Sequence, residues 1–114
     1  MARSTGQIFE DHMGALARGD VPGIMADYAD DAVLMAIDQV YVGKAEIQGF
    51  LEASFAAMPN ARFEPKGLQV YGDAVLVSWS ADSDTVRCSQ GTDTLIIRDD
   101  MIRLQTVCFS VEPK

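Results

Sequence analysis

Residues 92–109 read TDTLIIRDDMIRLQTVCF, and this stretch predicts a β-hairpin that closes a sheet. Two runs rich in β-branched and large apolar residues flank Arg98–Met101, which has the composition of a tight turn. We place Asp99 and Asp100 in the two-residue loop, so that residues facing each other across the hairpin can be assigned. The predicted pairs on one face are Ile97 with Ile102, Leu95 with Leu104, and Asp93 with Thr106. The other face then carries Thr94, Ile96, Arg103 and Gln105.

Asp93 is the carboxylate on the otherwise apolar face of this hairpin. An ionised carboxylate is costly to bury, so Asp93 must be paired, protonated, or directed into a cavity where chemistry uses it. The hairpin pattern therefore makes Asp93 a candidate functional residue.

The composition narrows the classes of function. A chain of 114 residues fits one compact domain, and 9 Lys+Arg against 17 Asp+Glu give a formal charge of −8. This sign disfavours nucleic acid and anionic membrane surfaces as partners. No apolar run approaches the roughly 20 residues of a membrane helix, and the N-terminus has no apolar signal-peptide segment. We expect a soluble, cytoplasmic protein.

The cysteines and the histidine do not predict a metal site. Cys88 and Cys108 fall on strands expected to be adjacent, so a disulfide is conceivable, but small buried thiols in a reducing compartment are the preferred interpretation. One histidine and two cysteines lack the spacing of zinc ligands. We expect neither a metal nor a cofactor.

The order of the elements predicts the fold class. Apolar spacing and capping residues predict helices that begin at Ser4 or Thr5, Asp20 and Lys44, the first ending at Arg18 and the last near Met58. The predicted strands cover residues 32–37, 62–71 and 74–81, followed by an acidic turn at 82–84 and the closing hairpin. The chain is therefore expected to be an α+β domain, in which a curved antiparallel sheet wraps around three N-terminal helices and leaves a pocket.

Two polar side chains of the helices are expected to face this pocket. His12 lies four residues from both Ile8 and Leu16, at the centre of an apolar stripe. It is either a core histidine bonded to a carbonyl or carboxylate, or a functional group. Tyr28 ends the apolar face of the second helix, where it either packs or directs its hydroxyl into the cavity.

Two residues of the predicted strands have open alternatives. Asp38 shares a side with Leu34 and Ala36 if alternation persists, so it is either a carboxylate aimed at the pocket or part of a solvated turn. Trp79, the only tryptophan, alternates with Val75 and Val77 and lines either the pocket or a subunit interface.

Four segments together resemble a known family. They are IFEDHMGALARGDV at 8–21, DYADDAV at 27–33, VGKAEI at 42–47 and GTDTLIIRD at 91–99. These segments resemble SnoaL-like and ketosteroid-isomerase-like proteins of the nuclear-transport-factor-two-like superfamily. The resemblance covers nearly the whole chain, which we interpret as a single SnoaL-like domain over residues 1–114.

The resemblance implies a cone-shaped α+β barrel with an apolar pocket, commonly dimeric through the outer face of the sheet. It also implies roles for individual positions, by likeness to the isomerase. His12 takes the position of an oxyanion-hole tyrosine, Asp93 that of the oxyanion-hole acid, Tyr28 that of a supporting tyrosine and Phe50 that of a pocket aromatic. The general-base position holds Ala36, although Asp38 follows two residues later.

Two functions remain open from the sequence. The first is a cofactor-independent isomerase, polyketide cyclase or dehydratase acting by proton transfer on an apolar carbonyl compound. It would use Asp93 either protonated, as a donor to the oxyanion, or ionised and paired with His12, while Asp38 or a water moves the proton. The second is a non-catalytic protein that binds a small apolar molecule. A homodimer through the outer sheet face is expected in either case, because Ile96, Gln105 and Val107 look exposed there.

Overall fold

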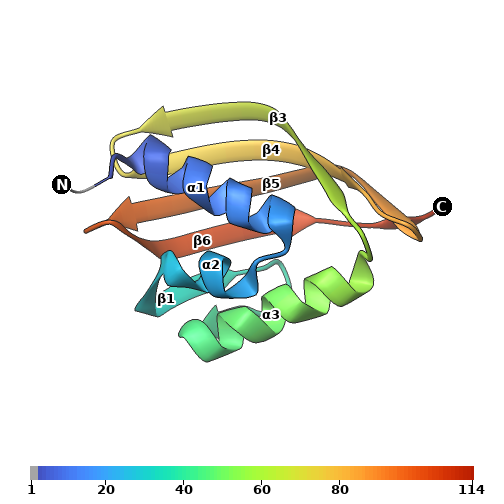
Figure 1. The fold of residues 1–114 in the computed structure, drawn as a ribbon, viewed down its shortest axis with the longest axis horizontal. Coiled ribbons are helices and arrows are strands. Elements are labelled where there is room, and N and C mark those ends of the chain that lie inside the picture. Colours follow the sequence, from blue (N-terminus) through green and yellow to red (C-terminus); the bar gives the residue numbers. More distant parts are fainter. Residues whose placement is uncertain (1–2) are drawn as a thin grey trace.

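The computed structural model describes residues 3–114, which form three helices packed against one curved sheet of seven strands (Figure 1). The helices are α1 (Thr5–Arg18), α2 (Val21–Ala26) and α3 (Lys44–Ala57). The strands are β1 (Tyr28–Met35), β2 (Val40–Val42), β3 (Arg62–Tyr71), β4 (Ala74–Asp82), β5 (Val86–Arg98), β6 (Met101–Phe109) and β7 (Glu112–Pro113). The predicted α+β class, with a curved sheet around three helices, is confirmed.

The sheet is mixed rather than purely antiparallel. Its order is β2-β1-β6-β5-β4-β3, with β7 beside β5, and the two end strands β2 and β3 do not pair to close it. β1 runs parallel to β6, whereas the other pairs are antiparallel. A hairpin fixes the antiparallel direction of neighbouring strands, but β1 and β6 are far apart in sequence and carry no such signal.

The ends of α1 follow the capping signals of the sequence. The Ser4 hydroxyl accepts a hydrogen bond from the backbone N–H of Gln7, and Gly19 ends the helix in the left-handed conformation with φ 64°. The helix buries His12 in the same stripe as Ile8 and Ala15. The predicted inward direction of His12 is therefore confirmed.

The second helix is shorter than predicted. It ends at Ala26, so that Tyr28 is the first residue of β1 and not the last position of a helical face. Tyr28 pairs with Ile102 of β6, and the next pair of this ladder comes only at Val33, because the register shifts between them. Tyr28 still points inward and is 1% exposed.

The closing hairpin has the predicted turn but a different register beyond it. Asp99 and Asp100 have φ 52° and 67°, as a two-residue hairpin loop requires. Ile97 faces Ile102 as predicted, but a bulge that leaves Arg103 without a partner shifts the following pairs by one residue. The pairs beyond it are Ile96 with Leu104, Leu95 with Gln105, Thr94 with Thr106, and Asp93 with Val107.

This bulge reverses the faces predicted for part of β6. Because side chains alternate along a strand, one extra residue moves all that follow to the opposite face. Gln105 and Val107, which were predicted on the outer face, are buried on the inner one. Thr106, predicted inside, pairs with Thr94 on the outer side.

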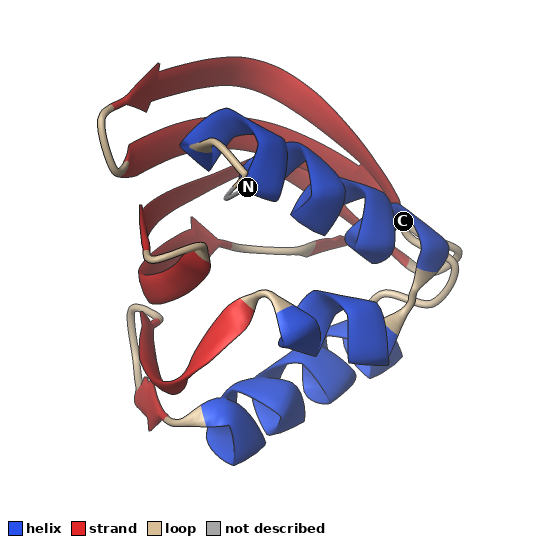
Figure 2. Ribbon diagram, turned by 60° about the vertical axis from the view of Figure 1, so that its left-hand side comes forward, coloured by secondary structure: helices blue, strands red, loops and turns tan. Residues whose placement is uncertain are grey.

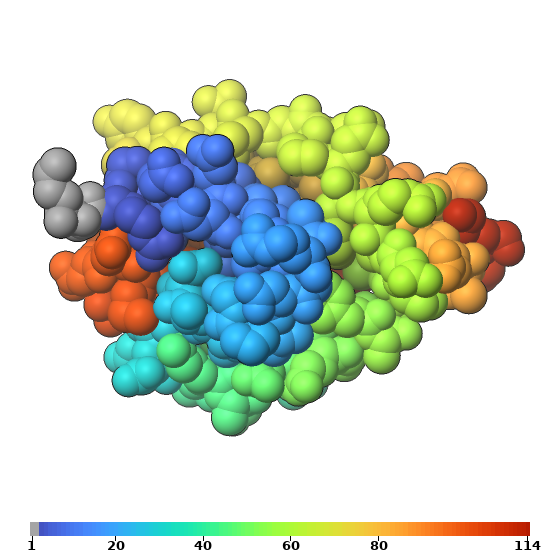
Figure 3. All heavy atoms as spheres, in the orientation of Figure 1, coloured from blue at the N-terminus to red at the C-terminus, as the bar shows by residue number. Residues whose placement is uncertain are grey.

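The helices cover the concave face of the sheet (Figures 2 and 3). α1 packs on β3 and β4, while α3 packs on β1 and β2, so that apolar side chains from helices and sheet form one core. The convex face exposes the apolar residues Met35, Val40, Val42 and Leu76.

Cys88 is buried but Cys108 is exposed, so the expectation of two buried thiols is wrong for Cys108. No helix in residues 3–114 is long and apolar enough to cross a membrane.

Candidate functional site

A cavity of about 90 Å³ lies between the helices and the concave face of the sheet. Its walls are mainly aliphatic and aromatic. The polar groups on the walls are His12, Tyr28, Ser54, Trp79, Asp93 and Gln105. Convergent polar groups in an apolar cavity are typical of a small-molecule site.

Asp93 is held in this cavity by two hydrogen-bond donors. The indole Nε1 of Trp79 donates to its Oδ1 at 2.8 Å, and the amide Nε2 of Gln105 donates to its Oδ2 at 2.7 Å. Gln105 in turn accepts a hydrogen bond from the Tyr28 hydroxyl. Burial raises the pKa of Asp93, although the two hydrogen bonds and the nearby His12 oppose the shift. The site therefore favours a neutral carboxyl group more than water does.

Tyr28 contacts both His12 and the group of residues that holds Asp93. Its ring meets the His12 ring edge-on at a centroid distance of 5.4 Å, and its hydroxyl reaches Gln105. Burial raises the pKa of Tyr28, and the carboxylates of Asp93 and Asp27 raise it further. The hydroxyl consequently stays protonated and acts as a hydrogen-bond donor.

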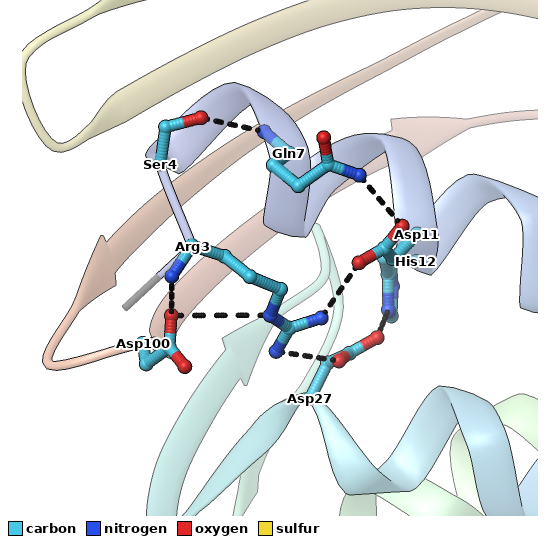
Figure 4. A network of polar contacts seen from close by, with 7 residues as sticks. All are labelled: Arg3, Ser4, Gln7, Asp11, His12, Asp27 and Asp100. Atoms are coloured by element: carbon cyan, nitrogen blue, oxygen red, sulfur yellow. Dashed lines mark hydrogen bonds and ion pairs between the residues drawn. The ribbon is translucent and has the colours of Figure 1, made fainter. Parts of the chain in front are cut away.

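His12 pairs with Asp27, a residue that the sequence did not single out (Figure 4). Its Nδ1 lies 3.2 Å from the Asp27 Oδ2, and both side chains are buried. A carboxylate only accepts hydrogen bonds, so Nδ1 carries the hydrogen of this contact, and in the neutral imidazole the lone pair is then on Nε2. The predicted pairing of His12 with an ionised Asp93 is therefore replaced by a pairing with Asp27.

Arg3 supplies the counter-charge for Asp27. Its guanidinium lies 3.5 Å from the Asp27 Oδ1 and 2.9 Å from the Asp11 Oδ2, while its backbone N–H donates to Asp100 (Figure 4). The Asp27 carboxyl group thus lies between the His12 ring and the guanidinium of a partly exposed arginine. This network therefore supports the tautomer assigned to His12.

The other predicted site residues separate into two groups. Trp79 and Phe50 line the cavity, and Trp79 faces it from the inner side of the sheet. Ala36 and Asp38 do not line it. They belong to the connection after β1, where the Ala36 N–H bonds the Gln39 carbonyl, and Asp38 is exposed. β1 ends at Met35, so the alternation that would have aimed Asp38 inward does not persist.

Sequence reasoning missed Asp27 and Gln105 for different reasons. Asp27 caps the end of the short helix α2 and meets His12 only because α1 packs against α2, although Asp27 directly precedes the singled-out Tyr28. Gln105 was assigned to the outer face because the bulge at Arg103 has no clear sequence signature. Within residues 3–114 no group of three His, Cys, Asp or Glu side chains is arranged to hold a metal ion.

Replacing Asp93 with asparagine is expected to raise stability increasingly as the pH rises. Because burial raises the pKa of Asp93 in the folded state, the wild type loses stability from the ordinary pKa of an aspartate upward, until the folded pKa is passed. Asparagine cannot ionise and resembles the neutral acid. Denaturant unfolding of both proteins between about pH 4 and pH 8 would measure this. Asp38→Asn is the exposed control, and parallel stability curves for Asp93→Asn and the wild type would contradict the argument.

Comparison with known proteins gives a family and a fold. The family model described as the SnoaL-like domain matches residues 9–105. A proposed polyketide cyclase from Sinorhizobium meliloti has a TM-score of 0.78 and 22% identity, with 88% of this chain and 92% of that one covered. A proposed ketosteroid isomerase from Kribbella flavida has a TM-score of 0.80 and 16% identity, covering 93% and 77%. TerC, co-crystallised with polyporic acid, has a TM-score of 0.77 and 16% identity, covering 93% and 91%. No curated protein sequence matches the chain.

Proposed function

The chain belongs to the family of SnoaL-like domains, and from that premise we propose that it is a cofactor-independent enzyme that moves a proton on a small apolar carbonyl compound. The observation that carries this proposal is that His12, which is buried and paired with Asp27, lines the same apolar cavity as Asp93. Fold alone does not select an activity, so the argument depends on these side chains.

His12 is the proton-transfer group in this proposal. With a hydrogen on Nδ1, its Nε2 takes a proton from the carbon next to the substrate carbonyl, and the electron pair of the broken C–H bond moves to the carbonyl oxygen. The imidazolium formed is stabilised by the Asp27 carboxylate, as in other histidine–carboxylate pairs. His12 thereby takes the role for which the sequence offered Asp38.

Asp93 stabilises the oxyanion that this step creates. A neutral carboxyl group can donate a hydrogen bond to the developing negative charge, and ketosteroid isomerase uses a protonated aspartic acid in this way. Trp79 and Gln105 fix the direction of the carboxyl group. The proton then returns from His12 to the same or another carbon, which gives exchange or isomerisation.

The second candidate is a protein that binds an apolar molecule without converting it. The observation that favours it is Ala36, which stands where the family resemblance puts a general base, while Asp38 lies outside the cavity. In such a protein the polar groups of the cavity would only orient the ligand.

Hydrogen–deuterium exchange at the carbon next to a ketone separates the two candidates. A panel of apolar ketones such as β-tetralone is incubated in D₂O, and mass spectrometry follows deuterium uptake above the buffer rate. We expect His12→Gln to lower the rate about 10²–10⁴-fold and Asp93→Asn to lower it as well, with Asp30→Asn as the exposed control outside both spaces. Saturable quenching of Trp79 fluorescence without exchange would identify the binding protein instead.

We also propose that two chains associate through the convex face of the sheet. Met35, Val40, Val42 and Leu76 expose more apolar surface there than a solvated sheet needs. Gln105 and Val107 do not contribute, because the bulge turns them inward. Sedimentation equilibrium at two concentrations is expected to show a dimer that Val42→Lys dissociates; a wild type that stays monomeric would contradict this.

A further inference from the structure

A second hollow lies outside the cavity, between α3 and the loops at the ends of β1 and β6. This groove measures about 420 Å³, and it is bordered by the turn that carries Ile37 and Asp38, by Ala53 and Ala57 of α3, and by Val111. The two alanines lie one helical turn apart on the same face of α3. Because their side chains are short, α3 forms a shallow floor at this point.

The groove and the inner cavity share a boundary. Five side chains line both spaces: Phe50, Ser54, Met58, Val107 and Phe109. Phe50, Ser54 and Phe109 are only partly buried, and the Ser54 hydroxyl is already bonded to the Phe50 carbonyl. These residues therefore form an apolar boundary that the two spaces share. Met58 contributes a flexible side chain to this boundary.

We propose that the site takes an elongated molecule with its carbonyl end in the cavity and an apolar tail that passes between these shared residues into the groove. This inference rests on the proposed function only for the choice of a carbonyl group. The inner cavity of about 90 Å³ is much smaller than the groove, so the larger part of such a molecule lies outside it.

The residues at the rim of the groove indicate the polarity and charge of the ligand tail. Ile37 is 83% exposed and Val111 is 41% exposed, so two large apolar side chains on the loops that border the groove have little protein covering them. A hydrocarbon or aromatic tail would bury part of both. Asp38 is the carboxylate at this rim. It disfavours a tail that ends in an anionic group, so the tail is neutral or cationic.

Binding of two phenyl ketones tests the proposal without any need for turnover. Acetophenone has no tail beyond its methyl group, whereas octanophenone carries an alkyl tail long enough to enter the groove. Quenching of Trp79, the only tryptophan and a residue of the cavity wall, reports both. We expect the wild type to bind octanophenone at least about tenfold more tightly than acetophenone.

A charge placed in the groove is expected to weaken the binding of the longer ketone alone. Ala57→Glu puts a carboxylate in the path of the tail and should weaken octanophenone binding about tenfold or more, with acetophenone unchanged. Ala56→Glu is the matched control, because Ala56 is also exposed on α3 but lines neither space, and it should change neither affinity. Ala53→Glu should repeat the effect of Ala57→Glu.

Two results would overturn the inference. One is equal affinity of the wild type for both ketones, and the other is unchanged octanophenone binding in Ala57→Glu and Ala53→Glu. Failure of deuterium exchange, with the dependence on tail length intact, would instead reject the proposed enzyme and leave the two-part site in place.

Discussion

Replacing Gly91 with alanine is expected to lower the free energy of unfolding by about 1–3 kcal/mol and to abolish ligand binding in the cavity. Gly91 faces Trp79 across the β4–β5 ladder, and a Cβ atom there would overlap carbon atoms of the indole ring. The ring cannot move aside freely, because it packs against Phe63 and Phe109 at centroid distances of 5.6 Å. Displacement of the indole would also break its hydrogen bond to Asp93.

Denaturant unfolding and quenching of Trp79 by octanophenone measure the two effects of Gly91→Ala separately. Gly49→Ala is the control, because Gly49 lies inside α3 with no atom within 4 Å of the position of a Cβ. Alanine there should stabilise the protein by about 0.5–1 kcal/mol, through higher helix propensity alone. A Gly91→Ala protein that keeps wild-type stability and binding would show that the indole is not held as described.

The position of Asp93 could be predicted because its signal is local. A two-residue loop and strict alternation over a few residues suffice to put Asp93 on the face that points inward. The same local logic places His12, since helical spacing aligns it with Ile8 within a single element. Both side chains line the cavity of the folded protein.

The polar partners of these residues depend on features without a local signal. Gln105 reaches Asp93 only because one extra residue in β6 reverses the alternation, and the strand sequence reads equally well without it. Asp27 reaches His12 because two elements pack together, which no periodicity encodes. The parallel pairing of β1 with β6 is likewise a property of the assembled sheet. His12 and Asp93, which carry the candidate chemistry, were thus visible in the sequence, while their partners Asp27 and Gln105 were not.

Asp38 shows the opposite failure, in which a local rule was extended too far. Alternation from Leu34 would aim it inward, but β1 ends at Met35 and the chain turns toward β2. A carboxylate in such a turn is solvated, as the alternative interpretation of the sequence held. Its place at the rim of the groove gives it a different use, which is to select the charge of a ligand tail.

Replacing Asp27 with asparagine is expected to lower the rate of deuterium exchange about 10²–10⁴-fold while the fold is kept. Asparagine fills the same space but removes the charge that stabilises an imidazolium, and its amide can donate to Nδ1 as readily as accept from it. His12 then loses the fixed tautomer that keeps the lone pair on Nε2. Because the pair is buried, we also expect a loss of about 1–3 kcal/mol in the free energy of unfolding.

The tautomer of His12 can be measured directly. Asp27→Asn would leave it unchanged if the role of Asp27 were purely structural. His12 is the only histidine in the chain, so the imidazole ¹⁵N signals of a labelled protein belong to it without further assignment. The wild type should show hydrogen on Nδ1, and Asp27→Asn should show a mixture of tautomers. Asp11→Asn is the matched control, since Asp11 contacts Arg3 but does not touch His12. If Asp27→Asn kept the wild-type tautomer and rate, Asp27 would be a structural residue, and His12 would act without a positioning carboxylate.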